Sequence, residues 1–174
     1  MSAGFLAEPD RPGRARVASS SALKCGPALM RVRRSASDWR QAVSLVGQPL
    51  VDAGCARPGF TDRLVSVIET YGPYMVIAPG LALVHAHPGL DSLSGGMSAV
   101  TLPEGVSFGH AHFDPVGLII GLTAASPAEH LSIIAEVASA LEQQPDLVRE
   151  SLTAHTPAAL AGLLRERLPH LPLA

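Results

Sequence analysis

The sequence predicts an α/β fold, a single layered domain in which a mixed sheet of four to five strands is flanked by helices. Segments with apolar residues at helical spacing come first, short apolar runs bounded by Gly and Pro follow, and helical segments return at the end. The longest apolar run, residues 116–125, is typical of a central strand covered on both faces. With 174 residues, 47% of them hydrophobic and 16% charged, the chain can bury a sizeable core.

Two helices are expected before the strands. Ser37 is a suitable N-cap for the first helix, because apolar residues recur at helical spacing directly after it. Gly47 and Pro49 should interrupt that helix and leave residues 50–53 as a separate short helical piece. Thr61 can cap the second helix.

The strands and the later helices follow from local signals. Four apolar runs bounded by turn residues predict strands over residues 74–78, 81–85, 97–102 and 116–124. Residues 126–129 form a capping box with Pro at the first helical position, so a helix should run from there to about Gln143. Two further helices should begin at Pro145 and Thr156.

Charge is distributed unevenly along the chain. Residues 1–34 carry seven Lys/Arg against two acidic residues, whereas residues 35–174 carry six against thirteen. The first segment shows no periodicity, so we expect a disordered basic tail over 1–34 and a folded domain over 35–170. The acidic body disfavours a nucleic-acid-binding domain. Without an apolar run of roughly 20 residues or a signal-peptide pattern at the start, the chain is expected to be a cytoplasmic protein.

Histidine is the side chain most suited to chemistry here. Five of the seven histidines lie between residues 85 and 130, an interval without cysteine, lysine or arginine. Near neutral pH an imidazole is a nucleophile, a proton carrier or a metal ligand. His85 ends a predicted strand, and His130 lies in the first turn of a capped helix, where backbone N–H groups and the helix dipole attract an anion. We take His85 and His130 as candidate catalytic residues, against the alternative that each is a purely structural or surface histidine.

A metal site is the alternative chemistry. His85 and His87 form one His-x-His pair and His110 and His112 another, which is compatible with zinc. No carboxylate is reserved nearby for each ring, as zinc sites usually require, so we predict no metal and no cofactor. Asp114, before a proline, is expected to form a turn or to orient one of the histidines.

Residues 72–88 resemble the active-site segment of enzyme IIA components of the bacterial phosphoenolpyruvate-dependent sugar phosphotransferase system. The resemblance is to the mannitol/fructose superfamily (type 2), and within it the ascorbate-type branch is closest. Residues 103–110 and 114–116 continue the resemblance, and residues 129–131 fall where that family has its second histidine. It covers about residues 37–168.

The resemblance implies a phosphotransferase with a phosphohistidine intermediate. His85 would accept phosphate from the small histidine phosphocarrier protein and pass it to a cysteine of a IIB component during sugar uptake, with ascorbate as a candidate sugar. His130 would support the phosphoryl group, and His87, His110 and Asp114 are weaker supporting candidates. The membrane would be reached only through the IIC transporter, nucleic acid is not an expected partner, and a homodimer stays open.

Three residues depart from the family pattern. Val84 stands where the family usually has Pro, His87 where the ascorbate branch commonly has Arg, and Glu69 where the mannitol branch has an arginine. Loss of the Arg removes a fixed positive charge, which His87 replaces only when it is protonated. A IIA-like regulatory module without a transport role, and a zinc-binding protein, therefore remain alternatives.

Overall fold

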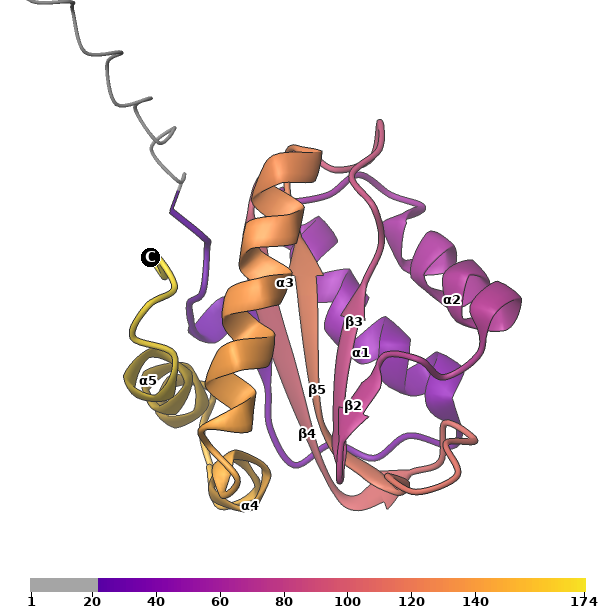
Figure 1. The fold of residues 1–174 in the computed structure, drawn as a ribbon, viewed down its shortest axis with the longest axis vertical. Helices are drawn as coiled ribbons and strands as arrows, with labels where there is room; N and C mark the ends of the chain where they lie inside the picture. Colours follow the sequence, from indigo (N-terminus) through magenta and orange to yellow (C-terminus); the bar gives the residue numbers. More distant parts are fainter. Residues whose placement is uncertain (1–21) are drawn as a thin grey trace, which may run out of the picture.

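A mixed five-stranded sheet forms the centre of the computed structural model, which describes residues 22–174 (Figure 1). The strand order is β1-β4-β5-β3-β2, with β1–β4 and β3–β5 parallel and the other two pairs antiparallel. The strands are β1 (Met30–Arg31), β2 (Val76–Ala78), β3 (Leu81–His85), β4 (Gly96–Val106) and β5 (Val116–Thr123). The mixed α/β sheet confirms the predicted fold class. Every residue of β5 is buried, as its continuous apolar sequence predicts.

Helices cover both faces of this sheet. In Figure 1, α3 crosses in front of the strands while α1 passes behind them beside α2, and α4 and α5 lie toward one lower corner. The helices are α1 (Trp39–Asp52), α2 (Phe60–Tyr71), α3 (Pro127–Glu142), α4 (Leu147–Leu152) and α5 (Pro157–Arg167). Among residues 22–174, none of these helices combines the length and apolar character needed to cross a membrane.

The predicted capping box at the start of α3 is confirmed. The Ser126 hydroxyl accepts a hydrogen bond from the Glu129 N–H, and the Glu129 carboxylate accepts one from the Ala125 N–H at 2.8 Å. The first bond satisfies a backbone donor that the helix itself leaves unpaired, whereas the second goes to the residue before the N-cap rather than to the Ser126 N–H. Thr156 caps α5 in the same way, by accepting from the Ala159 N–H. The local sequence therefore determines where α3 begins, and with it the position of His130.

The predicted interruption of the first helix is wrong. Helix α1 continues through Gly47 and Pro49, and residues 50–52 are its last turn. A Cβ atom on Gly47 would lie 2.8 Å from Oγ1 of Thr61, so glycine is needed here for α2 to approach closely. Burial of Leu50 against the core offsets the hydrogen bond that a proline removes inside a helix.

Other differences lie at the ends of elements. Asp38, not Ser37, is the N-cap of α1, and its carboxylate accepts from the Gln41 N–H at 2.9 Å. Helix α2 begins at Phe60 with Gly59 as its N-cap, so the expected cap Thr61 is the second residue of the helix. Shifts of one or two residues are common at helix ends.

The expected disordered tail is corrected for residues 22–34, which belong to the fold. Leu23 is fully buried, and Met30 pairs with Ala99 in the parallel contact between β1 and β4. The Cys25 N–H donates to the carbonyl of Ala174 at 2.8 Å, so the folded unit extends beyond both ends of the predicted 35–170 domain. Residues 1–21 of the predicted tail lie outside the described residues.

Candidate functional site

A pocket of about 530 Å³ opens where β3 ends. His85 is the last residue of β3, and His130 reaches the same pocket from the first turn of α3. The fold thus brings together the two histidines that the sequence singles out, although they are 45 residues apart. The pocket is lined by Val67, Tyr71, Tyr74, His85, Ala86, His87 and His130.

The ring of His85 is held in one orientation by its own strand. Its Nδ1 atom lies 2.8 Å from the carbonyl oxygen of Leu83. A carbonyl oxygen only accepts, so Nδ1 carries the proton and Nε2 keeps its lone pair. Burial lowers the pKa of His85, and the neighbouring His87 adds to this, while the Leu83 bond acts in the opposite sense. The ring is therefore neutral near pH 7, with a free nitrogen.

His130 completes a group of three imidazoles. Its ring centroid lies 5.4 Å from that of His85 and 5.3 Å from that of His87. Burial lowers the pKa of His130, and the nearby His85 and His87 lower it further. The pocket thus groups three rings that can donate or accept hydrogen bonds, and the pKa values of two of them, His85 and His130, are lowered.

The start of α3 offers less to an anion than the sequence suggests. Pro127 has no N–H, the Glu129 N–H is bonded to Ser126, and the His130 N–H donates to the Ser126 carbonyl at 2.9 Å. Three of the first four residues of α3 therefore lack a free backbone donor. Any support from this helix comes chiefly from the His130 ring, which corrects the expected role of the backbone N–H groups.

His110 and Asp114 lie away from the three-histidine pocket, contrary to the supporting role expected for them. Their turn is attached to Gly80, before the start of β3, through the Phe113 carbonyl, whereas His85 ends that strand. Burial raises the pKa of Asp114, but the hydrogen bonds it accepts outweigh burial and leave the pKa lowered. Asp114 is thus a turn former. Its carboxylate accepts from the Ser107 hydroxyl and from the N–H groups of Phe108, Gly109 and His110.

The two His-x-His pairs do not form one cluster. His85 and His87 are in the pocket, while His110 stacks on Phe113 with 4.7 Å between ring centroids. Across residues 22–174, no three side chains from His, Cys, Asp and Glu are grouped so that they could hold a metal ion.

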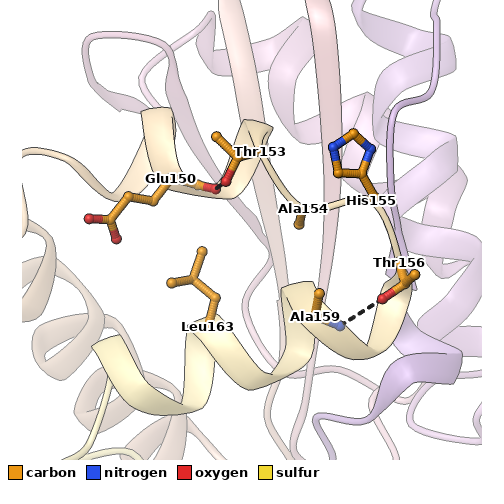
Figure 2. A pocket seen from close by; sticks show the side chains of 7 residues that line it. All are labelled: Glu150, Thr153, Ala154, His155, Thr156, Ala159 and Leu163. Atoms are coloured by element: carbon orange, nitrogen blue, oxygen red, sulfur yellow. Dashed lines mark hydrogen bonds between the residues drawn. The ribbon is translucent and has the colours of Figure 1, made fainter.

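A second hollow, of about 470 Å³, lies between α4 and α5 (Figure 2). Figure 2 shows the side chains of Glu150 and His155 pointing away from each other. The hydroxyl of Thr156 caps α5, and that of Thr153 donates to the Glu150 carbonyl at 2.6 Å. The two threonine hydroxyls are thus used in local helix contacts, and the Glu150 carboxylate pairs with Arg167 of α5 at 2.6 Å, so this hollow does not resemble a reactive site.

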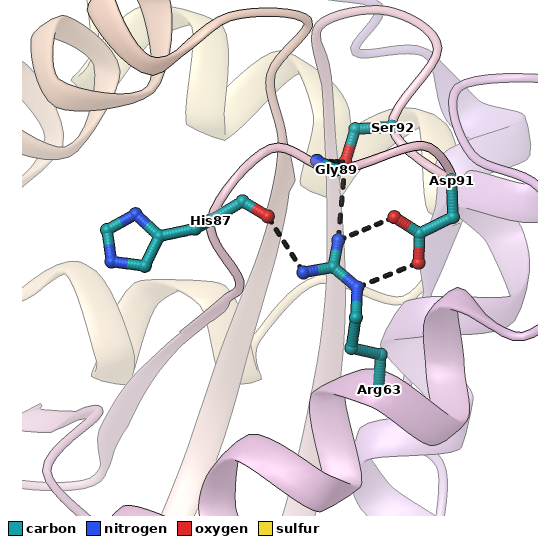
Figure 3. Close-up of polar contacts among 5 residues, drawn as sticks. All are labelled: Arg63, His87, Gly89, Asp91 and Ser92. Carbon is teal, nitrogen blue, oxygen red and sulfur yellow. Dashed lines mark hydrogen bonds and ion pairs between the residues drawn. The ribbon is translucent and has the colours of Figure 1, made fainter.

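Sequence reasoning missed Arg63 and Asp91, which brace the loop after β3 (Figure 3). Nε and one terminal nitrogen of Arg63 donate to the two oxygens of Asp91 at 2.8 and 2.7 Å. The other terminal nitrogen donates to the carbonyl of His87 at 2.7 Å. Their separation of 28 residues gave no signal, because only the tertiary fold brings α2 next to this loop.

The family model for "Phosphoenolpyruvate-dependent sugar phosphotransferase system, EIIA 2" matches residues 26–166. The chain belongs to this family. It is therefore a phosphocarrier of the phosphotransferase system, as the resemblance implied. The EIIA 2 match begins inside the segment that we expected to be a tail, which agrees with the burial of Leu29 and Met30.

Relatives of this EIIA 2 protein have been named for two sugars. The ascorbate-specific EIIA component of Mycoplasma pneumoniae is 34% identical over 71% of this chain and 77% of its own length. The solution structure of the mannitol-specific cryptic enzyme IIA of Escherichia coli covers 80% of this chain and 93% of its own, at 30% identity and a TM-score of 0.68. The Escherichia coli mannitol IIA, solved in complex with phosphorylated enzyme IIB, shares the fold: 22% identity, TM-score 0.66, with coverage of 83% and 96%.

Proposed function

We propose that His85 is the residue that carries the phosphoryl group. It would accept the group from the histidine phosphocarrier protein and pass it to a cysteine of a IIB component during sugar uptake. The observation that carries this proposal is the orientation of His85, whose Nδ1 is tied to Leu83 while its other nitrogen is unengaged by that bond. Family membership supplies the reaction, and the partly buried ring of His85, with its lowered pKa, is the nucleophile that we propose.

The transfer needs no cofactor. The lone pair on Nε2 of His85 attacks phosphorus, and the N–P bond of the donor phosphohistidine breaks, returning its electrons to the donor imidazole. In the second step a cysteine thiolate of the IIB component attacks the same phosphorus, and the bond to His85 breaks. Splitting the transfer in this way leaves the pocket with positioning and charge stabilisation as its main tasks.

His130 is proposed as the supporting donor. Its ring lies 5.4 Å from that of His85 between centroids, close enough for an oxygen of a group on His85 to reach it. Because burial and its neighbours keep His130 mainly neutral, it offers one N–H rather than a full charge. A donor aimed at the transferring group stabilises the transition state without reorganisation of solvent.

The surface around the pocket suits protein partners. Tyr71 and Tyr74 line the pocket and are 72% and 49% exposed, and Leu131, next to His130, is 70% exposed. Exposed apolar side chains grouped around a reactive residue are typical of a docking surface. We propose that the phosphocarrier protein and the IIB component use this surface in turn, in the cytoplasm. A homodimer stays a prediction.

The proposal is tested by incubating the protein with phosphoenolpyruvate, enzyme I and the histidine phosphocarrier protein, and then measuring intact mass. A gain of one phosphoryl group per chain is expected. Subsequent addition of a IIB component should remove it. Stable phosphorylation without onward transfer to any IIB component of the same organism would favour the regulatory alternative, and no phosphorylation at all would overturn the proposal.

A further inference from the structure

The guanidinium of Arg63 connects α2 to the loop that follows His85. Nε and one terminal nitrogen of Arg63 donate to the two oxygens of Asp91, at 2.8 and 2.7 Å. The other terminal nitrogen donates to the carbonyl of His87 at 2.7 Å (Figure 3). Bidentate pairing of this kind fixes the direction of both side chains as well as their distance. The backbone of His87 is thus held to α2 by a directed, charge-assisted hydrogen bond.

The surroundings keep this arrangement in place. The Arg63 side chain is 32% exposed and that of Asp91 20%, so water screens the pair less than it screens an open surface pair. The guanidinium carbon lies 5.5 Å from the ring centre of buried Phe60. On the other side, the Asp91 carbonyl accepts from the Arg57 N–H at 2.8 Å. The loop is therefore anchored at both the side chain and the backbone of Asp91.

His87, whose backbone Arg63 holds, lies at the proposed phosphoryl site. The ring of His87 lines the pocket, with its centroid 5.3 Å from that of His130. Asp91 balances the charge of Arg63, so Arg63 is not a free cation for phosphate. Its effect on the pocket must therefore pass through the position of His87.

We infer that Arg63 is a positioning residue of the phosphoryl site, which acts with Asp91 to hold the His87 ring where it can donate to a phosphoryl group on His85. This rests on the proposed role of His85. The chain then supplies a second donor beside the reactive histidine. This donor is the ring of His87, which an arginine of α2 holds in place. Misplacement of a positioned group by about 1 Å can cost up to a hundredfold in rate, so a loosened loop should be measurable.

A double-mutant cycle on the full-length protein tests this inference. The rate of phosphoryl acceptance is measured for Arg63→Ala, His87→Ala and the double variant. Each single change should slow acceptance roughly tenfold. The double variant should be no slower than His87→Ala alone, because Arg63 acts through His87. Arg40→Ala is the matched control, since it removes an Arg–Glu69 pair that does not line the pocket.

If Arg63→Ala slows phosphoryl acceptance by the same factor in the wild type and in His87→Ala, the inference is overturned. A merely structural role of Arg63 would not depend on the His87 ring. A second readout does not need phosphoryl transfer. The proximity of His87 contributes to the lowered pKa of His130, so Arg63→Ala should raise the His130 titration midpoint by NMR, as His87→Ala should. An unchanged midpoint in Arg63→Ala contradicts the inference. If the wild-type protein takes up no phosphate, the proposed function fails while this titration still decides the role of Arg63.

Discussion

The Nδ1 atom of His85 lies 2.8 Å from the carbonyl oxygen of Leu83, two residues earlier on the same strand. This contact selects the tautomer with the proton on Nδ1, because the carbonyl has no proton to give. The same ring lines the pocket at the end of β3. Under the proposed function, the strand that carries His85 therefore also determines which of its nitrogens reacts.

The phosphoryl group is predicted to be on Nε2 of His85. Phosphorylation at Nδ1 would break the bond to Leu83 and leave a buried carbonyl without a partner. NMR of protein labelled with ¹⁵N at histidine distinguishes the two isomers through their nitrogen shifts and phosphorus couplings. A Nδ1-phosphohistidine would show that the ring turns over before it reacts.

His130→Ala should slow phosphoryl acceptance without preventing it. The change leaves the nucleophile and removes one donor, which typically costs about 3 kcal/mol, or on the order of a hundredfold in rate. His130→Gln keeps an N–H donor and should recover part of the loss. The measurement is single-turnover phosphorylation, with exposed His155→Ala as the control. A rate equal to that of the wild type would remove His130 from the site.

His87→Arg should change how phosphoryl acceptance depends on pH. A guanidinium stays charged throughout the accessible range, whereas an imidazole is charged only when protonated. The ratio of the variant rate to the wild-type rate is therefore expected to rise as pH increases. The rates are compared from mildly acidic to mildly alkaline pH with the same donor. A ratio that does not change with pH would show that the charge at residue 87 is not used.

The protein is predicted to lose stability in mild acid through His85 and His130. The pKa values of His85 and His130 are lowered in the folded state, so the unfolded chain binds protons first as pH falls below its histidine value of about 6.5. Each such group lowers the free energy of unfolding by up to about 1.4 kcal/mol per pH unit, until pH reaches its folded pKa. Denaturant unfolding of wild type and of His85→Asn/His130→Gln measures the slopes. The double variant should depend less on pH, and an equal slope would contradict this origin.

Removal of residues 1–34 is predicted to destabilise the fold. The deletion takes away Leu23, Leu29 and Met30, each at most 3% exposed. Burial of one such side chain typically contributes about 1.5–3 kcal/mol. Thermal unfolding of a chain that begins at Ser35 should show a Tm many degrees below that of a chain that begins at Ala22. Equal Tm values would show that the β1 segment adds little to the core.

Elements with local signals could be predicted closely. Strand β3 has the predicted bounds, and α3 begins at the predicted capping box. These two elements indicated in part that His85 and His130 would lie at one site. One histidine ends a strand and the other begins a helix, and such ends adjoin the loops where sites form. The family resemblance ranked them above the other histidines.

Features that depend on distant pairings could not be predicted. Strand β1 has only two residues and pairs with β4 about 70 residues later, so no periodicity marks it. Gly47 looks like a helix breaker until α2 is known to approach it. Arg63 and Asp91 meet across 28 residues, and neither has a neighbour in sequence that indicates the pairing. In each case the deciding partner belongs to another element.

The central claim is that His85 carries the phosphoryl group, and intact mass after incubation with phosphoenolpyruvate, enzyme I and the histidine phosphocarrier protein tests it most directly. The wild type and the control His155→Ala should each gain one phosphoryl group that is labile in acid and stable in base. His85→Ala, which lacks the Nε2 nucleophile, should show no gain while its circular dichroism stays that of the folded protein. Full phosphorylation of His85→Ala would contradict the account.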